Sequence, residues 1–340
     1  MSIIRTAILG YGRSGSTLHA DPIEKNKAFQ LTAACDVDAT ARQKAVARFG
    51  CRPYDNYHRM LKEEPLDLVV IVTRGDQHCQ MACDCLAAGV NVLVTKPWAV
   101  NAAEAQRMVR AAESSGKLLL PWLPARWGSD LRRLRQLVIE EQAIGTVFLV
   151  RRMQGSFGTR NDWQTERRYG GGYLLNWGPH IVDTPIQLMG SPVKSVYGRF
   201  KQAINPGDVE DLFMGLLTLT NGTLVQAEYT ITTESLPTWF LQGTRGTIVV
   251  NGKQLKVNAS TPAQPSNPTQ YIAMKAAADR VLEETLTGNL YGDEHQVYVE
   301  IAAALRSEAH FAVTPASALE LSRVLDAIRT SSDENRVVMV

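Results

Sequence analysis

Short apolar stretches alternate with longer amphipathic ones along the first 120 residues. Apolar runs rich in β-branched residues lie at positions 6–9, 31–35, 68–73 and 90–94, with helical patterns between them. This alternation is typical of βαβ units, whose strands form a doubly wound parallel sheet. The sequence therefore predicts an α/β domain over residues 1–121.

The pattern changes after Leu120-Pro121-Trp122. A helix is predicted at 130–141, and strands at 147–153, 193–200, 212–219, 224–232, 238–242 and 246–250. Asn221-Gly222 joins two of these runs and is a strong hairpin signal. We therefore expect a second, α+β domain over residues 122–340, with a mixed, mostly antiparallel sheet.

The last 80 residues show three helical patterns and one irregular segment. Residues 260–270 are rich in Pro, Ser, Thr and Asn, which predicts a loop. Helices are predicted at 271–287, 293–306 and 316–329, the last one after Thr314-Pro315, because proline is tolerated in the first turn of a helix.

A glycine-rich turn directly follows the first predicted strand and opens the first helix. Glycine permits a tight turn and lets the backbone approach a pyrophosphate, while the helix N-terminus supplies N–H donors. This context makes a G-x-G-x-x-G match credible as a dinucleotide site of the Rossmann type. The predicted cofactor-binding residues of this turn are Gly10, Tyr11, Gly12, Arg13, Ser14 and Gly15.

Asp36 stands at the end of the second predicted strand, 21 positions after Gly15. A carboxylate there accepts hydrogen bonds from the adenosine ribose and repels a 2′-phosphate, so NAD is favoured over NADP. The alternative is that Asp36 belongs to a polar turn. Arg13 and Arg42 leave NADP open as the cofactor.

Composition indicates an ordinary globular protein with a small-molecule partner. Of 340 residues 45% are hydrophobic, and 36 basic against 34 acidic residues give a net charge of +2 without basic blocks. This excludes an obvious nucleic-acid or anionic-membrane surface. No apolar run approaches the roughly 18 residues of a membrane span. The chain enters strand-like sequence at Ile3 with no leader, so we expect a cytoplasmic location.

Five scattered cysteines argue for reduced thiols. His78, Cys79, Cys83 and Cys85 form the tightest cluster, and Cys79 and Cys83 would share a helical face. Because no second half completes a set of four ligands, we expect packing and no metal.

Further motifs carry a family resemblance over essentially the whole chain. They are Thr95-Lys96-Pro97, the segment from Thr73 to His78, Ala125-Arg126-Trp127 and GGGYLLNWGPHIVD at 170–183. With the glycine turn, they resemble the Gfo/Idh/MocA oxidoreductases (glucose-fructose oxidoreductase, inositol dehydrogenase and rhizopine catabolism proteins). The resemblance implies a Rossmann domain joined to an open-faced α/β domain.

The resemblance also implies roles for two catalytic residues. Lys96 would lie beside the nicotinamide and the substrate hydroxyl, where a cation favours alkoxide character. His180 would accept the proton, since imidazole titrates near neutral pH. Thr73, His78, Lys96 and Pro97 would lie on the cofactor side.

Asn176 and Asp183 flank His180 on the predicted helix. Asp183 would orient the imidazole. Many members of the resembling family carry aspartate where this chain has Asn176, and an amide cannot take a proton. Pro179 leaves two alternatives for Asn176, a substrate ligand or the N-cap of a helix that begins near Trp177. Thr95 and Arg74 are further departures, from glutamate and proline.

The resemblance implies hydride transfer between NAD or NADP and a secondary hydroxyl of a sugar, polyol or inositol. An aromatic face suits a sugar ring and charged neighbours suit its hydroxyls. The predicted substrate-binding residues are Arg160, Asp162, Trp163, Tyr173 and Asn176.

Two other functions stay open at this stage. One is a non-catalytic NAD-binding sensor, although Lys96 and His180 are both retained. The other is a glycosidase that recycles tightly held NAD. The resemblance further implies a homodimer or homotetramer formed through the second sheet.

Overall fold

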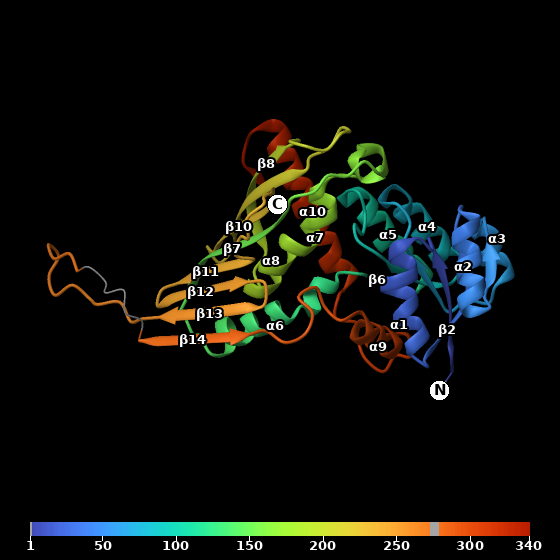
Figure 1. Ribbon diagram of the computed structural model, residues 1–340, viewed down its shortest axis with the longest axis horizontal. Coiled ribbons are helices and arrows are strands. Elements are labelled where there is room, and N and C mark those ends of the chain that lie inside the picture. The colour runs from blue at the N-terminus through green and yellow to red at the C-terminus, as the bar shows by residue number, and fades with distance from the viewer. Residues whose placement is uncertain (1, 273–278) are drawn as a thin grey trace. The chain divides into compact units, whose positions relative to one another are not determined.

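The computed structural model describes residues 2–272 and 279–340, which form two compact units. The first unit comprises Met1–Pro124, Glu166–Gly171 and Asp293–Arg323. The second comprises Ala125–Thr165, Gly172–Gly292 and Val324–Val340. The chain therefore passes between the units several times (Figure 1).

The first unit contains a six-stranded, fully parallel sheet in the order β3-β2-β1-β4-β5-β6. Its strands are β1 (Ile4–Leu9), β2 (Phe29–Cys35), β3 (Arg52–Tyr54), β4 (Leu68–Ile71), β5 (Asn91–Val94) and β6 (Leu119–Pro121). All four residues of β4 are fully buried, as in a parallel sheet covered on both faces. The predicted doubly wound sheet is confirmed, although β3 and β6, with three residues each, were not predicted.

Helices connect these strands. They are the π-helical turn η1 (Gly15–His19) with α1 (Ala20–Lys25), α2 (Ala39–Phe49), α3 (Tyr57–Glu63), α4 (Gly75–Ala87) and α5 (Ala102–Ser115). α9 (Glu294–Leu305), capped by Asp293, joins this unit from far along the chain. It brings Tyr298 against His19, whose Nδ1 lies 2.9 Å from the Tyr298 hydroxyl. Both side chains are fully buried.

The second unit is built on a nine-stranded mixed sheet in the order β14-β13-β12-β11-β7-β10-β9-β8-β15. The strands are β7 (Val147–Ser156), β8 (Val193–Lys201), β9 (Leu212–Leu219), β10 (Leu224–Ile231), β11 (Trp239–Gly243), β12 (Gly246–Asn251), β13 (Gln254–Ala259), β14 (Arg280–Thr285) and β15 (Val338–Met339). The pair β10–β7 is parallel and the other pairs are antiparallel. The six predicted strands and the turn at Asn221-Gly222 are confirmed, with Gly222 at φ 87°.

One face of this sheet is covered by helices (Figure 1). They are the 3₁₀ turn η2 (Pro124–Trp127), α6 (Ser129–Arg135) with the π-helical turn η3 (Gln136–Glu140), α7 (Tyr173–Ile181), α8 (Asp183–Met189) and the end of α10 (Pro315–Glu334). The strands alternate accordingly. In β9, Phe213 and Leu217 are fully buried, whereas Met214 and Leu216 are 40% and 46% exposed.

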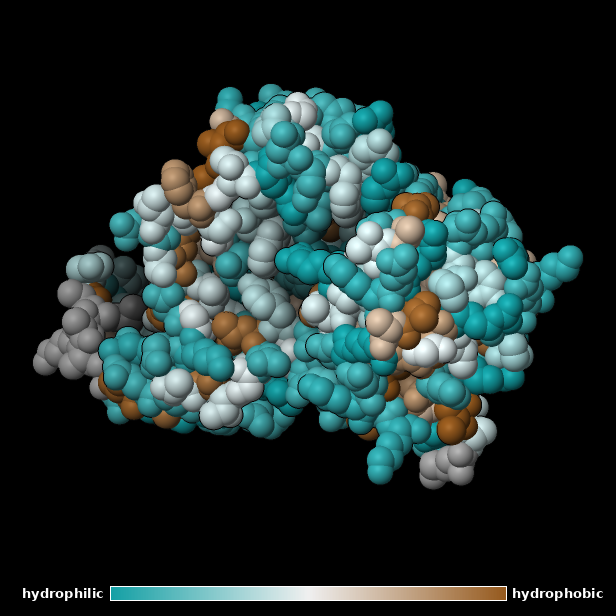
Figure 2. Space-filling model, turned by 45° about the vertical axis from the view of Figure 1, so that its right-hand side comes forward, coloured by the Kyte–Doolittle hydropathy of each residue, from teal (hydrophilic) through white to brown (hydrophobic). Residues whose placement is uncertain are grey.

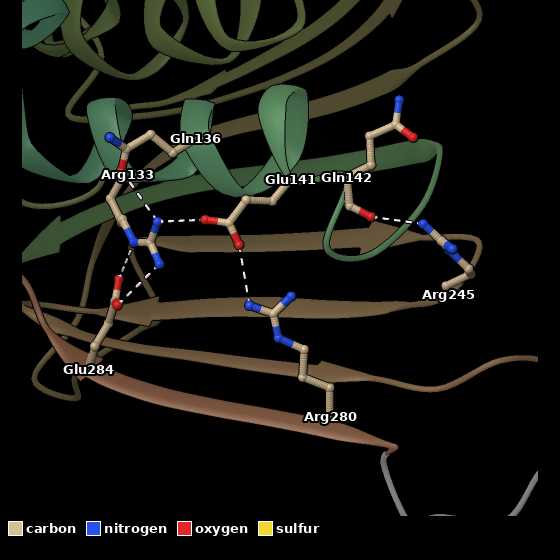
Figure 3. A network of polar contacts seen from close by, with 7 residues as sticks. All are labelled: Arg133, Gln136, Glu141, Gln142, Arg245, Arg280 and Glu284. Carbon is tan, nitrogen blue, oxygen red and sulfur yellow. Dashed lines mark hydrogen bonds and ion pairs between the residues drawn. The ribbon is translucent and has the colours of Figure 1, made fainter.

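The helix predicted at 271–287 is wrong where the structure describes it. Residues 280–285 form β14, and residues 273–278 lie outside the described residues. Charged cross-links hold β14: Lys256 pairs with Glu283 at 2.6 Å and Arg133 pairs with Glu284 at 2.6 Å. Arg133 also pairs with Glu141, which binds Arg280, so the segment after α6 is tied to the sheet edge (Figure 3).

The predicted helix at 130–141 is confirmed as α6 and η3, and the loop at 260–270 shows only turns and bends. The helix predicted at 316–329 is confirmed as the longer α10. Within the described ranges no helix is long and apolar enough to cross a membrane. Hydrophilic residues predominate on the face shown in Figure 2, with apolar ones in small groups among them.

Candidate functional site

The candidate cofactor site of the first unit lies at the carboxyl edge of the parallel sheet, where the strand order reverses between β1 and β4. Open α/β sheets bind ligands at this point. Gly10 follows β1 with φ 90°, and a Cβ on it would lie 2.7 Å from the Val72 carbonyl oxygen. A Cβ on Gly15 would lie 2.1 Å from the Gly10 carbonyl oxygen. Both positions therefore require glycine.

Gly12 differs from these two glycines. The described residues leave open space within 4 Å of a Cβ built on it. The helical segment starts at Arg13, so its first backbone N–H groups directly follow Gly12 in the sequence. The turn thus fits a phosphate group in the way that the sequence predicts.

Asp36 is bonded to this turn. Its Oδ2 accepts the N–H of Tyr11 at 2.7 Å and its Oδ1 accepts the N–H of Asp38 at 2.9 Å. Arg42 donates to the carbonyl oxygens of Asp36 and Val37 at 2.7 and 3.1 Å. The side chain of Tyr11 is only 3% exposed, so its backbone takes part in the turn while its ring packs inside.

His78 links two other strand ends of the same edge. Its Nδ1 lies 2.7 Å from the Pro97 carbonyl oxygen and its Nε2 lies 3.0 Å from the Thr73 carbonyl oxygen. Burial lowers the pKa of His78, while the two carbonyls oppose that shift. Because its side chain is fully buried, His78 supports the backbone at Thr73, after β4, and at Pro97, the residue that follows Lys96.

Lys96 stands two residues after β5, half-buried, between Thr95 and Pro97. Arg74, the departure noted above, stacks on Tyr169 with its Cζ 4.0 Å from the ring centre and lies 3.5 Å from Asp76. The 166–171 segment is thereby held on the start of α4.

A separate group of candidate residues lies on and around α7, in the second unit. This helix begins at Tyr173 after Gly172, so Asn176 lies within it and the N-cap alternative is wrong. Glu210 occupies the helix start: its Oε1 accepts the N–H of Leu174 at 2.9 Å. A Cβ on Gly172 would lie 2.4 Å from this carboxylate oxygen, which explains the last glycine of the GGG run.

His180 is 7% exposed and lies among aromatic rings. Its centroid lies 5.8 Å from that of Trp177 and 5.5 Å from that of Tyr291. Trp177 stacks on Tyr229 at 5.2 Å, and Tyr173 lies 4.5 Å from Tyr229. This set of five, which we call the aromatic cluster, brings together the predicted Tyr173 and His180 with three residues that were not predicted.

Asp183 has a partner that the sequence did not suggest. Its two carboxylate oxygens accept Arg126 Nε and Nη2, each at 2.8 Å, and Oδ1 also accepts Gln187 at 3.2 Å. Asp183 is 1% exposed and the Arg126 side chain 10% exposed. The carboxylate therefore locks the start of α8 to η2, directly after the helix that carries His180.

Arg160 and Asp162 also come together. Arg160 Nη2 donates to Asp162 at 3.1 Å and Nη1 donates to Gln164 at 2.6 Å, and Asp162 accepts the N–H of Gln164. Trp163 begins the 3₁₀ turn η4 (Trp163–Thr165) and is half-exposed. These residues form an ordered turn in the second unit.

The cysteine cluster packs in and around α4. All five cysteines lie in the described part of the chain and are free thiols. Burial raises the pKa of the Cys79 thiol to about 12. Across residues 2–272 and 279–340, no three His, Cys, Asp or Glu side chains are grouped so that they could hold a metal ion.

Two family models match the chain. Residues 4–121 match the oxidoreductase family with an NAD-binding Rossmann fold, and residues 131–249 match the GFO/IDH/MocA C-terminal domain. The chain belongs to the GFO/IDH/MocA family. It is an oxidoreductase with an NAD-binding Rossmann domain, as the motifs predict.

Related proteins match two thirds or more of the chain. The chain is 23% identical to scyllo-inositol 2-dehydrogenase (NADP(+)) of Bacillus subtilis (strain 168), over 99% of this chain and 96% of the relative. It is 28% identical to D-glucoside 3-dehydrogenase of Escherichia coli (strain K12), over 67% and 70% of the two chains. The WlbA dehydrogenase of Bordetella pertussis, solved with NADH and UDP-GlcNAcA, shares the fold at a TM-score of 0.83 and 23% identity. The match covers 100% of this chain and 99% of the WlbA chain.

Sequence reasoning missed Trp177, Tyr229, Tyr291, Arg126 and Glu210 as parts of this site. Trp177 was within reach, because it precedes His180 by three positions and so lies on the same helix face. Tyr229 and Tyr291 come from a strand and a distant loop, and only the fold brings them to α7.

Proposed function

We propose that this oxidoreductase transfers a hydride between NAD and a secondary hydroxyl of a sugar, polyol or inositol. The observation that supports it best is His180, held in the aromatic cluster of a chain whose other unit carries the dinucleotide turn and Asp36. An aromatic-lined site with few polar groups suits a ring that bears hydroxyls.

The residues fit NAD. Gly10 and Gly15 permit the tight turn, Gly12 leaves open space for the pyrophosphate, and Asp36 retains lone pairs for the ribose hydroxyls besides its bonds to Tyr11 and Asp38. Arg42 is bonded to two backbone carbonyls, which favours NAD over NADP. When bound, NAD supplies the nicotinamide C4 that accepts the hydride.

His180 and Lys96 would both act on the substrate hydroxyl in this reaction. The imidazole would accept the hydroxyl proton while the carbinol hydrogen leaves as hydride with its C–H electron pair and a C=O bond forms. The ammonium of Lys96 stabilises the negative charge that develops on the oxygen. Asn176, which cannot take a proton, would orient a substrate hydroxyl by hydrogen bonding. The reverse reaction reduces a ketone of the same class.

The relatives support this substrate class. Inositol, glucoside and UDP-GlcNAcA appear in the names of related proteins and of a structure with the same fold. Trp163 and Arg160 with Asp162 would contribute a ring face and polar contacts for the substrate.

The same proposal includes a homodimer or homotetramer formed through the open sheet face. Met214, Leu216 and Leu224 are exposed there at 40%, 46% and 42%. Unpartnered apolar sheet surface of this kind favours pairing with a second copy.

The test is formation of NADH from NAD, or of NADPH from NADP, followed by absorbance with a panel of inositols, aldoses, glucosides and sugar acids. We expect net NADH with at least one member and a preference for NAD. A silent panel despite measured cofactor binding would reject the dehydrogenase and favour a sensor. Substrate cleavage without net NADH would favour a cofactor-recycling glycosidase.

A further inference from the structure

We propose that Tyr291 is a positioning residue for His180 and that Gln154 holds it in place. This inference rests on the proposed function, because it takes His180 as the proton acceptor. Tyr291 lies in a loop far from α7 in the sequence, and Gln154 is a polar residue of β7.

Two aromatic rings, from different segments of the chain, lie beside the imidazole of His180. The ring planes of Trp177 and Tyr291 are each inclined at 68° to the imidazole plane, with centroids 5.8 and 5.5 Å away. Edge contacts of this kind are a favoured arrangement of aromatic pairs. Trp177 lies on the same helix as His180, whereas Tyr291 approaches from the segment that follows β14, so together they restrict rotation of the imidazole.

Both neighbours are themselves held by the sheet. The Tyr291 hydroxyl donates to Gln154 Oε1 at 2.9 Å. Trp177 stacks on Tyr229 with only 26° between the planes, and the Tyr229 hydroxyl is bonded to Ser156 Oγ at 2.6 Å. Gln154 and Tyr229 are direct partners in the β7–β10 register. Two adjacent positions of one sheet therefore fix both rings around the imidazole.

The surroundings of Tyr291 indicate a neutral anchor. Burial raises the pKa of Tyr291, and the positive charge of Arg152 opposes this shift. Arg152 is 2% exposed and is bonded to the carbonyl oxygens of Met153 and Thr238. Its charge is also 3.8 Å from the carboxylate of Asp130. Tyr291 therefore keeps its proton at neutral pH, donates to Gln154, and acts through His180.

The first test observes His180 directly, in full-length protein labelled at the histidine Cε1 with ¹³C. The variant His180→Asn assigns its NMR signal among the six histidines. We expect Tyr291→Phe and Gln154→Leu to move or broaden the His180 signal and to leave those of His19 and His78 in place. The control Tyr197→Phe, which removes an exposed hydroxyl bonded to Asn335, should change none of them. An unchanged His180 signal in Tyr291→Leu would overturn the proposal.

The second test is kinetic, with whichever panel substrate is turned over. Tyr291→Phe and Gln154→Leu each remove the same hydrogen bond, so each should lower kcat about fivefold, and the double variant should lower it no further. Tyr291→Leu should lower kcat about 100-fold by displacing the imidazole. The KM for substrate and the affinity for NADH should stay within about twofold, because the change affects the chemical step.

Additive losses, or a rise in KM alone, would contradict a positioning role. If no substrate is turned over by the wild-type protein, the proposed function fails while the NMR signal still decides whether Tyr291 holds His180. The two failures are therefore distinguishable.

Discussion

The carboxylate of Asp36 accepts the backbone N–H of Tyr11 at 2.7 Å, so the end of β2 is bonded to the middle of the glycine turn. The residue that the sequence assigns to ribose recognition also holds the glycine turn in shape. The sequence left two interpretations of Asp36 open, a polar turn and a ribose ligand. They are compatible, because each carboxylate oxygen has two lone pairs.

We predict that Asp36→Asn weakens NAD binding by about tenfold or more, because a charge-assisted bond to the ribose is lost. NADP binding should weaken less, since repulsion of the 2′-phosphate is removed. Fluorescence titration with NADH and NADPH measures both affinities. Asp38→Asn is the matched control, because Asp38 is exposed and caps α2 through the Thr40 N–H. An unchanged NAD to NADP ratio in Asp36→Asn would reject the assignment.

The buried pair of Arg126 and Asp183 leads to a prediction about stability. Arg126→Met leaves the Asp183 carboxylate buried without its guanidinium, which should lower the free energy of unfolding by about 3–5 kcal/mol. The double variant Arg126→Met/Asp183→Leu should recover part of this loss, because the unpaired charge is gone. Urea denaturation measures both. If the double variant is the less stable one, desolvation of Asp183 is not the cause.

His19 predicts a dependence of stability on pH. Burial lowers its pKa from 6.5 to about 3, so the folded protein keeps it neutral while the unfolded chain binds a proton below pH 6.5. The free energy of unfolding should therefore fall as the pH drops, with His19 contributing about 2 kcal/mol of that fall between pH 6.5 and pH 5.

The variant His19→Gln should reduce this pH dependence, since an amide can bond Tyr298 but does not titrate. His58→Gln, at an exposed position, is the control and should leave the dependence as it is in the wild-type protein. Equal slopes of stability against pH in His19→Gln and in the wild type would contradict the role of His19.

The open sheet face predicts self-association. Leu216→Lys places a charge at the centre of the apolar residues of β9 and should shift a dimer or tetramer toward monomer in light scattering after size exclusion. Ile139→Lys is the control, because Ile139 is 50% exposed but lies on η3, outside the sheet. A wild-type monomer, or a Leu216→Lys oligomer of unchanged mass, would show that copies do not pair through this face.

Features that depend on residues close together in the sequence could be predicted from the sequence. The glycine turn follows its strand within one residue, and the Asn221-Gly222 hairpin is a local signal, so both were accessible. β14 was not, because neither face of Arg280–Thr285 carries a buried apolar row, and its strand character comes from pairing with β13 and from charged partners such as Arg133. Pairs such as Asp183 with Arg126, or Tyr291 with Gln154, join segments whose proximity arises only from the fold.

The most direct test of the central claim is a single-turnover measurement of hydride transfer with the active substrate and saturating NAD, comparing the wild type with Lys96→Met and His180→Asn. We predict that each variant lowers the rate of NADH formation by about 100-fold or more, because general-base and charge-stabilising groups are lost. NAD affinity should stay within about threefold in His180→Asn, because His180 acts on the substrate hydroxyl. A transfer rate in His180→Asn equal to that of the wild type would contradict the account.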